Sequence, residues 1–174
     1  MRDVLVVVDV INNFAHDDGG ALLESFRRRL DAIGSAIADA RASGTPVVYV
    51  NDAMGRWDGD APGFVQRAIE TGAGPDVVSA LAPAPQDSFL FKARYSAFDH
   101  TALDLLLAEL ECERILLCGA ATEGCVVQTG LDAREHGWKV TILARACATT
   151  NPELERLALS YAEQVGGIRV SDPD

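Results

Sequence analysis

The chain has 174 residues, 48% of them hydrophobic, and a formal net charge of −11 at pH 7. This length is enough for one compact domain with its own core and short for two domains of ordinary size. The acidic balance disfavours nucleic acid or an anionic membrane as a partner, because binding to either relies on clustered Lys and Arg. We therefore expect one domain over residues 1–174.

The sequence opens directly into an apolar strand-like run, without the basic segment and cleavage site of a secretory signal peptide. No apolar stretch reaches membrane-spanning length. This pattern predicts a soluble, cytoplasmic protein. The cysteines show no metal-finger spacing, so reduced thiols are expected, with Cys112, Cys118 and Cys147 as small buried hydrophobic side chains.

Apolar runs with strand character alternate with segments of helical periodicity along the chain. Strands are expected at residues 4–9, 46–51, 89–92, 115–118, 140–143 and 168–170. Such alternation is typical of a parallel sheet covered by helices on both faces. We therefore predict an α/β fold, a three-layer α/β/α sandwich around a Rossmann-like, mainly parallel six-stranded sheet.

Helices are predicted where apolar residues recur every three or four positions. The first runs from about residue 23 and ends at Gly44. Thr101 and Asp104 resemble a capping box before a leucine stripe at residues 103–110. Asn151 is the expected N-cap of the last helix, with Leu154, Leu157, Tyr161 and Val165 along one face. We expect the leucine stripes of both helices to lie in the core.

Two stretches, residues 52–63 and 72–86, do not fit this alternation. Both are rich in Gly, Pro and Asp, which predicts loops or short irregular helices.

The residue best placed for chemistry is Cys125, in the run CGAATEGCVVQT at residues 118–129. An apolar strand-like stretch stops there and a helix-like stretch begins, so the thiol is expected at the carboxyl edge of the sheet. The unpaired amides of a helix N-terminus favour both a thiolate and an oxyanion. Two other strand-like runs end in the charged residues Asp9 and Lys92. Together the three side chains predict an active site.

These residue types fit nucleophilic attack on an amide carbonyl. A free thiol has a pKa near ~8.5 and needs a base or a cation nearby to react at neutral pH. Lys92 is expected to stabilise the thiolate, while Asp9 takes the thiol proton and returns it to a leaving nitrogen. Water activated by Asp9 would then hydrolyse the thioester. Backbone amides of residues 121–125 are the natural donors to the oxyanion.

Aromatic residues are the candidates for the walls of a substrate pocket. Trp57 lies in the stretch after the second strand, which a parallel sheet places over its carboxyl edge. An equally good alternative is that Trp57 packs against its own loop. Phe14, Tyr95 and Phe98 are the other candidates.

Competing motifs are absent from the sequence. The segment GAATEGC has neither the dinucleotide spacing GxGxxG nor a phosphate loop, and His16, His100 and His136 show no short metal-binding spacing. We expect no cofactor and no metal.

Three motifs in order along the chain resemble the isochorismatase-like cysteine hydrolase superfamily. DVINNF at residues 9–14 is similar to the Asp-x-Gln-x-x-Phe of that family, KARYSAF at 92–98 to its Lys-x-x-x-Ser-x-Phe, and GAATEGCV at 119–126 to its Gly-x-x-Thr-acid-x-Cys. The superfamily includes isochorismatases, nicotinamidases, N-carbamoylsarcosine amidases and related amide hydrolases.

The resemblance implies that Asp9, Lys92 and Cys125 are the catalytic triad. It also implies a cis peptide between Ala120 and Ala121, with an oxyanion hole formed by the amides of Ala121 and Cys125. Because members of the family are often dimers or tetramers, it implies a homo-oligomer.

Two departures from the family pattern restrict the properties that the resemblance implies. Nicotinamidases have an Asp-x-His metal pair after the second strand, where this chain has Asp52, Ala53 and Met54, so a nicotinamide-anchoring metal is not expected. Ile11 stands where the family often has Gln, which removes any contact that a glutamine would make there.

Three hypotheses follow for the function. The first is a metal-independent cysteine hydrolase that cleaves a C–N bond in a small amide, carbamoyl or lactam compound. The second keeps the fold but uses Asp9 to protonate an isochorismate-like vinyl ether, which needs no thiol nucleophile. The third is a protein that binds a small molecule without hydrolysing it, with Cys125 as an oxidation sensor.

Overall fold

A computed structural model describes residues 1–171 of the chain. Six parallel strands form one sheet, in the order β3-β2-β1-β4-β5-β6. The strands are β1 (Asp3–Val8), β2 (Val47–Asp52), β3 (Ser88–Lys92), β4 (Arg114–Ala120), β5 (Lys139–Ala148) and β6 (Arg169–Ser171). The predicted α/β class and six-stranded sheet are confirmed, and the sheet is parallel throughout.

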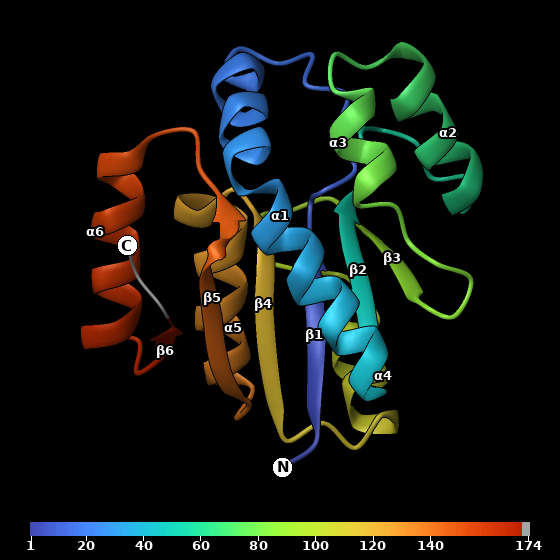
Figure 1. Cartoon of the computed structure of the whole chain (residues 1–174). Coiled ribbons are helices and arrows are strands. Elements are labelled where there is room, and N and C mark those ends of the chain that lie inside the picture. Colours follow the sequence, from blue (N-terminus) through green and yellow to red (C-terminus); the bar gives the residue numbers. More distant parts are fainter. Residues whose placement is uncertain (172–174) are drawn as a thin grey trace.

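Helices cover both faces of the sheet, which gives the three predicted layers (Figure 1). One face carries α1 (Gly19–Ser43), α2 (Ala61–Thr71) and α3 (Pro75–Ala80), and the other carries α4 (Leu103–Glu109), α5 (Val127–Glu135) and α6 (Pro152–Gln164). Because both faces are covered, strand β1 is apolar without alternation: Leu5 and Val7 pack on one side, and Val4, Val6 and Val8 on the other.

Local signals set several helix boundaries as predicted. Gly44 ends α1 in the left-handed conformation with φ of 74°, and the Asn151 side chain caps the first amides of α6. The segment expected to be loop or irregular helix at residues 72–86 contains the short helix α3, which begins at Pro75. Within residues 1–171, no helix has the length and apolar composition needed to cross a membrane.

The capping box expected before α4 is not formed. The Thr101 hydroxyl accepts a hydrogen bond from the Leu103 amide and donates one to the Ala97 carbonyl, and Ala102 occupies the N-cap position. Asp104 instead accepts a hydrogen bond from the Trp138 indole. The leucine stripe of this helix does reach the core, since Leu103 and Leu107 are fully buried.

The last helix is turned differently from the prediction. Leu154, Leu157 and Tyr161 of this helix, and Val165 at its C-cap, are about half exposed or more, at 51%, 49%, 53% and 68%. The buried side of α6 carries Ala162 and the charged residue Glu155. The rotation follows from an ion pair between Glu155 and Arg29 of α1, which a count of apolar residues does not reveal.

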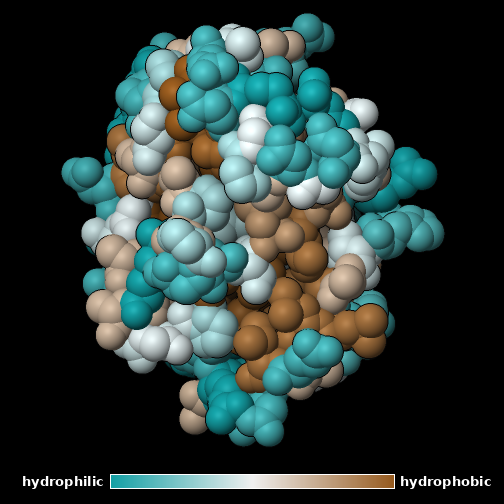
Figure 2. All heavy atoms as spheres, turned by 90° about the vertical axis from the view of Figure 1, so that its right-hand side faces the viewer, coloured by the Kyte–Doolittle hydropathy of each residue, from teal (hydrophilic) through white to brown (hydrophobic). Residues whose placement is uncertain are grey.

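The sheet ends at β3 on one side, and this edge is apolar. Phe89, Leu90 and Phe91 are only half-buried there. Hydrophobic side chains gather on this face of the molecule (Figure 2). Strand β3 ends at Lys92, whose side chain is buried in the protein.

Candidate active site

The strand order places a crevice at one point of the carboxyl edge. Strand order reverses between β1 and β4, and ligands of doubly wound sheets bind at this switch point. Asp9 follows β1 directly, and the turn that bears Cys125 follows β4. The backbone at Asp9 has φ of 50°, an uncommon conformation for a residue other than glycine.

Lys92 joins the other two predicted residues from the end of the edge strand β3. Its Nζ lies 2.7 Å from Asp9 Oδ2 and 3.4 Å from Cys125 Sγ, and it donates a third hydrogen bond to the Arg94 carbonyl at 2.9 Å. The Lys92 side chain is 1% exposed. The Asp9 carboxylate also accepts a hydrogen bond from the Asp52 amide at 2.6 Å. The structure therefore brings the three side chains together, as the sequence predicted.

The charges of this cluster are set by burial and by mutual contact. Burial raises the pKa of Asp9, although the Lys92 cation opposes this shift. Burial lowers the pKa of Lys92, but Asp9 and Cys125 outweigh it, so the net pKa is raised and the ammonium is retained. Asp9 and Lys92 therefore form a buried ion pair.

Burial also acts on the Cys125 thiol. Burial, reinforced by the Asp9 carboxylate and only partly opposed by Lys92, raises the pKa of Cys125 to about 12. The thiol thus lies beside the Asp9–Lys92 pair, and burial raises the pKa of both Asp9 and Cys125. A raised pKa of the thiol agrees with the predicted need for a base beside Cys125.

A cavity of about 530 Å³ opens above Asp9 and Cys125. Its lining residues include Ala120 and Ala121, the polar residues Asn12, Asn13, Asn51 and Thr150, and the ionisable residues His16, Asp18 and Asp52. None of the described residues that line it is Arg or Lys. Arg56 and Arg67 line an adjoining hollow, where both lie within ion-pair distance of Asp58. The cavity wall itself is therefore acidic.

Of the four residues predicted to form the cavity wall, one lines the cavity and three do not. Tyr95 lines the cavity. Phe14 is buried in the core, where its ring meets Phe26 edge to face, and Phe98 lies against the His136 ring on the opposite side of the sheet. Trp57 is 63% exposed and is not part of this wall. Apolar packing takes Phe14 and Phe98 away from the cavity, so for them and for Trp57 the prediction is corrected.

The turn that carries Cys125 has an unusual backbone. The peptide between Ala120 and Ala121 is cis, and a π-helical turn, η1 (Thr122–Val126), follows before α5 begins. Gly119, just before it, has φ of 118° and approaches strand β1 so closely that a Cβ atom would lie 2.0 Å from the Val8 carbonyl oxygen. Only glycine fits here without displacing β1.

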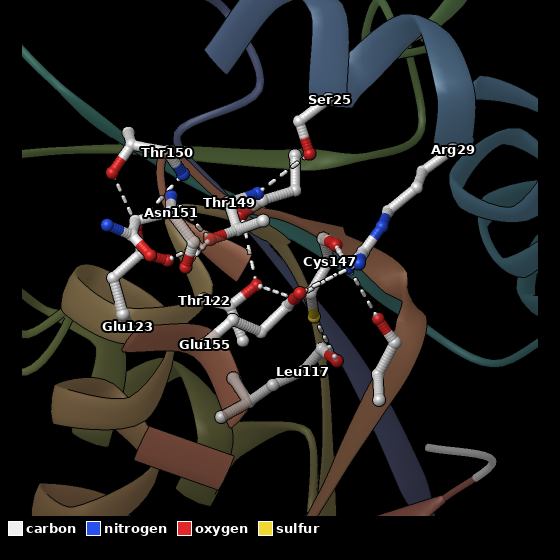
Figure 3. Close-up of polar contacts among 12 residues, drawn as sticks. Ser25, Arg29, Leu117, Thr122, Glu123, Cys147, Thr149, Thr150, Asn151 and Glu155 are labelled. Atoms are coloured by element: carbon white, nitrogen blue, oxygen red, sulfur yellow. Dashed lines mark hydrogen bonds and ion pairs between the residues drawn. The ribbon is translucent and has the colours of Figure 1, made fainter. Parts of the chain in front are cut away.

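Polar contacts tie this turn to the segment between β5 and α6 (Figure 3). Glu123 accepts hydrogen bonds from the Thr149 hydroxyl at 2.8 Å and from the amide and hydroxyl of Thr150. Burial acts to raise the pKa of Glu123, but these hydrogen bonds outweigh it and lower the pKa. Because Thr150 also lines the cavity, Glu123 fixes part of the cavity wall.

Sequence reasoning missed a second support on the β1 side. Asn51 is 1% exposed, and its side chain accepts a hydrogen bond from the Ile11 amide and donates one to the Ile11 carbonyl, both at 2.9 Å. The amide of Asn51 thus holds the backbone two residues after Asp9. The signal in the sequence that could have indicated this role is a polar residue, Asn51, near the end of an otherwise apolar strand.

No group of three or more His, Cys, Asp or Glu side chains is arranged to hold a metal ion within residues 1–171. Asp52 accepts a hydrogen bond from the Met54 amide.

The fold and the site together define a doubly wound α/β protein whose switch-point cavity holds an Asp-Lys-Cys cluster. A family model, the isochorismatase domain, matches residues 3–172. The chain belongs to the isochorismatase family.

Relatives within this family differ in what is known of them. The chain is 34% identical to the uncharacterized isochorismatase family protein YaaI of Bacillus subtilis, over 92% of this chain and 88% of that protein. It is 30% identical to the ureidoacrylate amidohydrolase RutB of Pantoea ananatis, over 92% of this chain and 74% of that protein. The crystal structure of nicotinamidase PncA from Bacillus subtilis superimposes with a TM-score of 0.77 at 26% identity, covering 99% of this chain and 100% of that one.

Proposed function

We propose that this isochorismatase-family hydrolase cleaves a C–N bond of a small amide, carbamoyl or lactam compound through a thioester on Cys125. The observation that carries the proposal is the contact geometry of the cluster: Lys92 Nζ lies 2.7 Å from Asp9 and 3.4 Å from the Cys125 sulfur, at the base of a cavity. Nucleophile, base and cation are thus within reach of one bound carbonyl.

The reaction proceeds by transfers that the three residues can perform. Asp9 takes the thiol proton as Sγ attacks the carbonyl carbon, and the amides of Ala121 and Cys125 stabilise the oxyanion. The C–N bond breaks as the leaving nitrogen takes the proton from Asp9, which leaves a thioester. Water then loses a proton to Asp9 and attacks the thioester, which releases the carboxylic acid and returns the proton to the thiol. The raised pKa of Asp9 suits both of its roles, because a carboxyl group of ordinary pKa would be a weaker base at neutral pH.

The charge of the cavity limits the charge of the substrates that can bind there. The acidic residues Asp18 and Asp52 line the cavity, Asp9 is paired with Lys92, and no described Arg or Lys lines it. An anionic substrate would meet like charges with no cation to receive it. We therefore propose a neutral or cationic amide as the substrate.

The test compares wild type with Cys125→Ala by intact-mass spectrometry, after incubation with a panel of amides, ureas, lactams and an electrophilic aldehyde. An adduct or acyl intermediate confined to wild type, with release of the acid, is expected. Neutral and cationic members of the panel should react in preference to matched carboxylates. Turnover that survives Cys125→Ala would refute the nucleophile.

One observation favours a second candidate function. The raised pKa of Asp9 also suits the protonation of a vinyl ether, the step that an isochorismatase-type reaction requires. That reaction predicts pyruvate release that survives Cys125→Ala and is lost in Asp9→Asn. Because isochorismate carries two carboxylates, the acidic wall makes it the weaker candidate. The raised pKa of Cys125 likewise disfavours an oxidation sensor, since oxidation proceeds through the thiolate.

A further inference from the structure

The turn that bears Cys125 is held to the start of α6 from both directions. Glu123 of the turn reaches out to Thr149 and Thr150, and Glu155 of α6 reaches back to Thr122 of the turn (Figure 3). The first contact also shapes the cavity wall, because Thr150 lines it. The second has no such role, since neither Thr122 nor Glu155 lines the cavity.

Glu155 is built into the protein by several charged contacts. Arg29 of α1 donates to both carboxylate oxygens of Glu155, at 2.6 and 2.8 Å, and also to the backbone carbonyls of Ala144 and Cys147. The Glu155 side chain is 9% exposed. Burying a carboxylate is costly unless it is paired and hydrogen-bonded, and here the paired guanidinium supplies both. The position of Glu155 is therefore fixed by α1 and β5 as well as by its own helix.

The Thr122 hydroxyl is the contact between this anchor and the reactive turn. Its oxygen lies 2.8 Å from Glu155 Oε1 and 3.0 Å from the Ala148 carbonyl oxygen, and it is fully buried. A hydroxyl has one hydrogen, so it donates to one of these acceptors at a time while both confine it. Thr122 directly follows Ala121, whose amide is proposed to bind the oxyanion, and the same π-helical turn contains Cys125.

We propose that Glu155, acting through Thr122, is a positioning residue that holds the Ala121 amide and the Cys125 thiol in register with Asp9 and Lys92. The inference rests on the proposed role of Cys125 as nucleophile. Glu155 touches neither the substrate cavity nor the reacting atoms, so its effect reaches the reaction only through the backbone of the turn. A small displacement of reacting groups is enough to lower a rate by ~10²-fold.

The test changes the contact at either end, by deleting the hydroxyl of Thr122 or the charge of Glu155. Thr122→Val keeps the size of the side chain and deletes the hydroxyl, Thr122→Ser keeps the hydroxyl, and Glu155→Gln keeps the shape and deletes the charge. Glu163→Gln is the matched control, because Glu163 lies on the same helix, is exposed, and takes no part in these contacts. Each variant is first checked for folding by circular dichroism and urea denaturation.

Two readouts separate positioning from general stability. For a substrate found in the amide panel, Thr122→Val and Glu155→Gln should lower kcat by roughly 10- to 100-fold with KM nearly unchanged, while Thr122→Ser and Glu163→Gln stay close to wild type. Independently of any substrate, the pH profile of Cys125 alkylation by iodoacetamide should shift by about half a pH unit or more in the two impaired variants, because the sulfur moves relative to Asp9 and Lys92.

Folded Thr122→Val and Glu155→Gln proteins with wild-type alkylation profiles would overturn the inference. Equal impairment of Glu163→Gln, or failure of Thr122→Ser to restore the profile, would also overturn it. Failure of the proposed function has a different signature: wild type would give no Cys125-dependent turnover with any amide, while the alkylation profiles would still report whether Glu155 positions the turn.

Discussion

Removing the Lys92 charge is the most informative perturbation of this site. In Lys92→Met the Asp9 carboxylate stays buried without its cation, which lies 2.7 Å away in the wild type. At an effective dielectric constant of 20, that separation corresponds to an attraction of about 6 kcal/mol. Protonation of Asp9 and local rearrangement recover part of this loss, so the free energy of unfolding should fall by about 3–5 kcal/mol.

The pH dependence of this loss has a definite sign. Burial already raises the pKa of Asp9, and loss of Lys92 raises it further. The folded variant then binds a proton more tightly than the unfolded chain, whose Asp9 has an ordinary pKa. Stability of the variant must therefore decrease as pH rises between those two pKa values. The loss should be larger at pH 8 than at pH 5.

Urea denaturation of wild type and variant at both pH values measures this effect. The double variant Asp9→Asn with Lys92→Met removes both charges and should be more stable at pH 8 than Lys92→Met alone. A Lys92→Met protein as stable as wild type at pH 8, or a loss independent of pH, would refute the buried ion pair. Hydrolytic turnover should be absent from both variants.

Three further predictions concern the supports of the site. Gly119→Ala should lower the free energy of unfolding by about 3 kcal/mol or more, because the new Cβ would lie 2.0 Å from the Val8 carbonyl oxygen. The control Gly124→Ala, in the same motif, adds a Cβ that meets nothing within 4 Å, and it should lower the free energy of unfolding by under about 1 kcal/mol. Equal denaturation midpoints for the two variants would contradict this prediction. Asn51→Ala should cost about 2–3 kcal/mol by urea denaturation, since it leaves the buried amide and carbonyl of Ile11 unpaired, and an unchanged midpoint would argue against that role. With a pKa of about 12, Cys125 should react with iodoacetamide more slowly than free cysteine at pH 7 and accelerate into the alkaline range, so rapid labelling at pH 7 would show that the thiol is ionised.

The sequence by itself determined the elements and which charged and thiol side chains share one edge of the sheet. Unbroken apolar runs such as residues 4–8 require burial on both faces, which implies a parallel sheet between helix layers. Because all strands of such a sheet point the same way, the residues that end them share one edge, and this was enough to group Asp9, Lys92 and Cys125. Gly44 and Asn151 marked helix ends through short-range backbone chemistry.

Only the tertiary structure decided how those elements meet. The outward turn of the apolar stripe on α6 depends on Arg29, which lies 126 residues before Glu155. The raised pKa of the Cys125 thiol depends on burial, and Phe14 and Phe98 lie in the core clusters of the two sheet faces instead of in the cavity wall. Local patterns record which backbone conformation a segment prefers, whereas desolvation, ion pairing and helix rotation depend on partners that are distant in the chain.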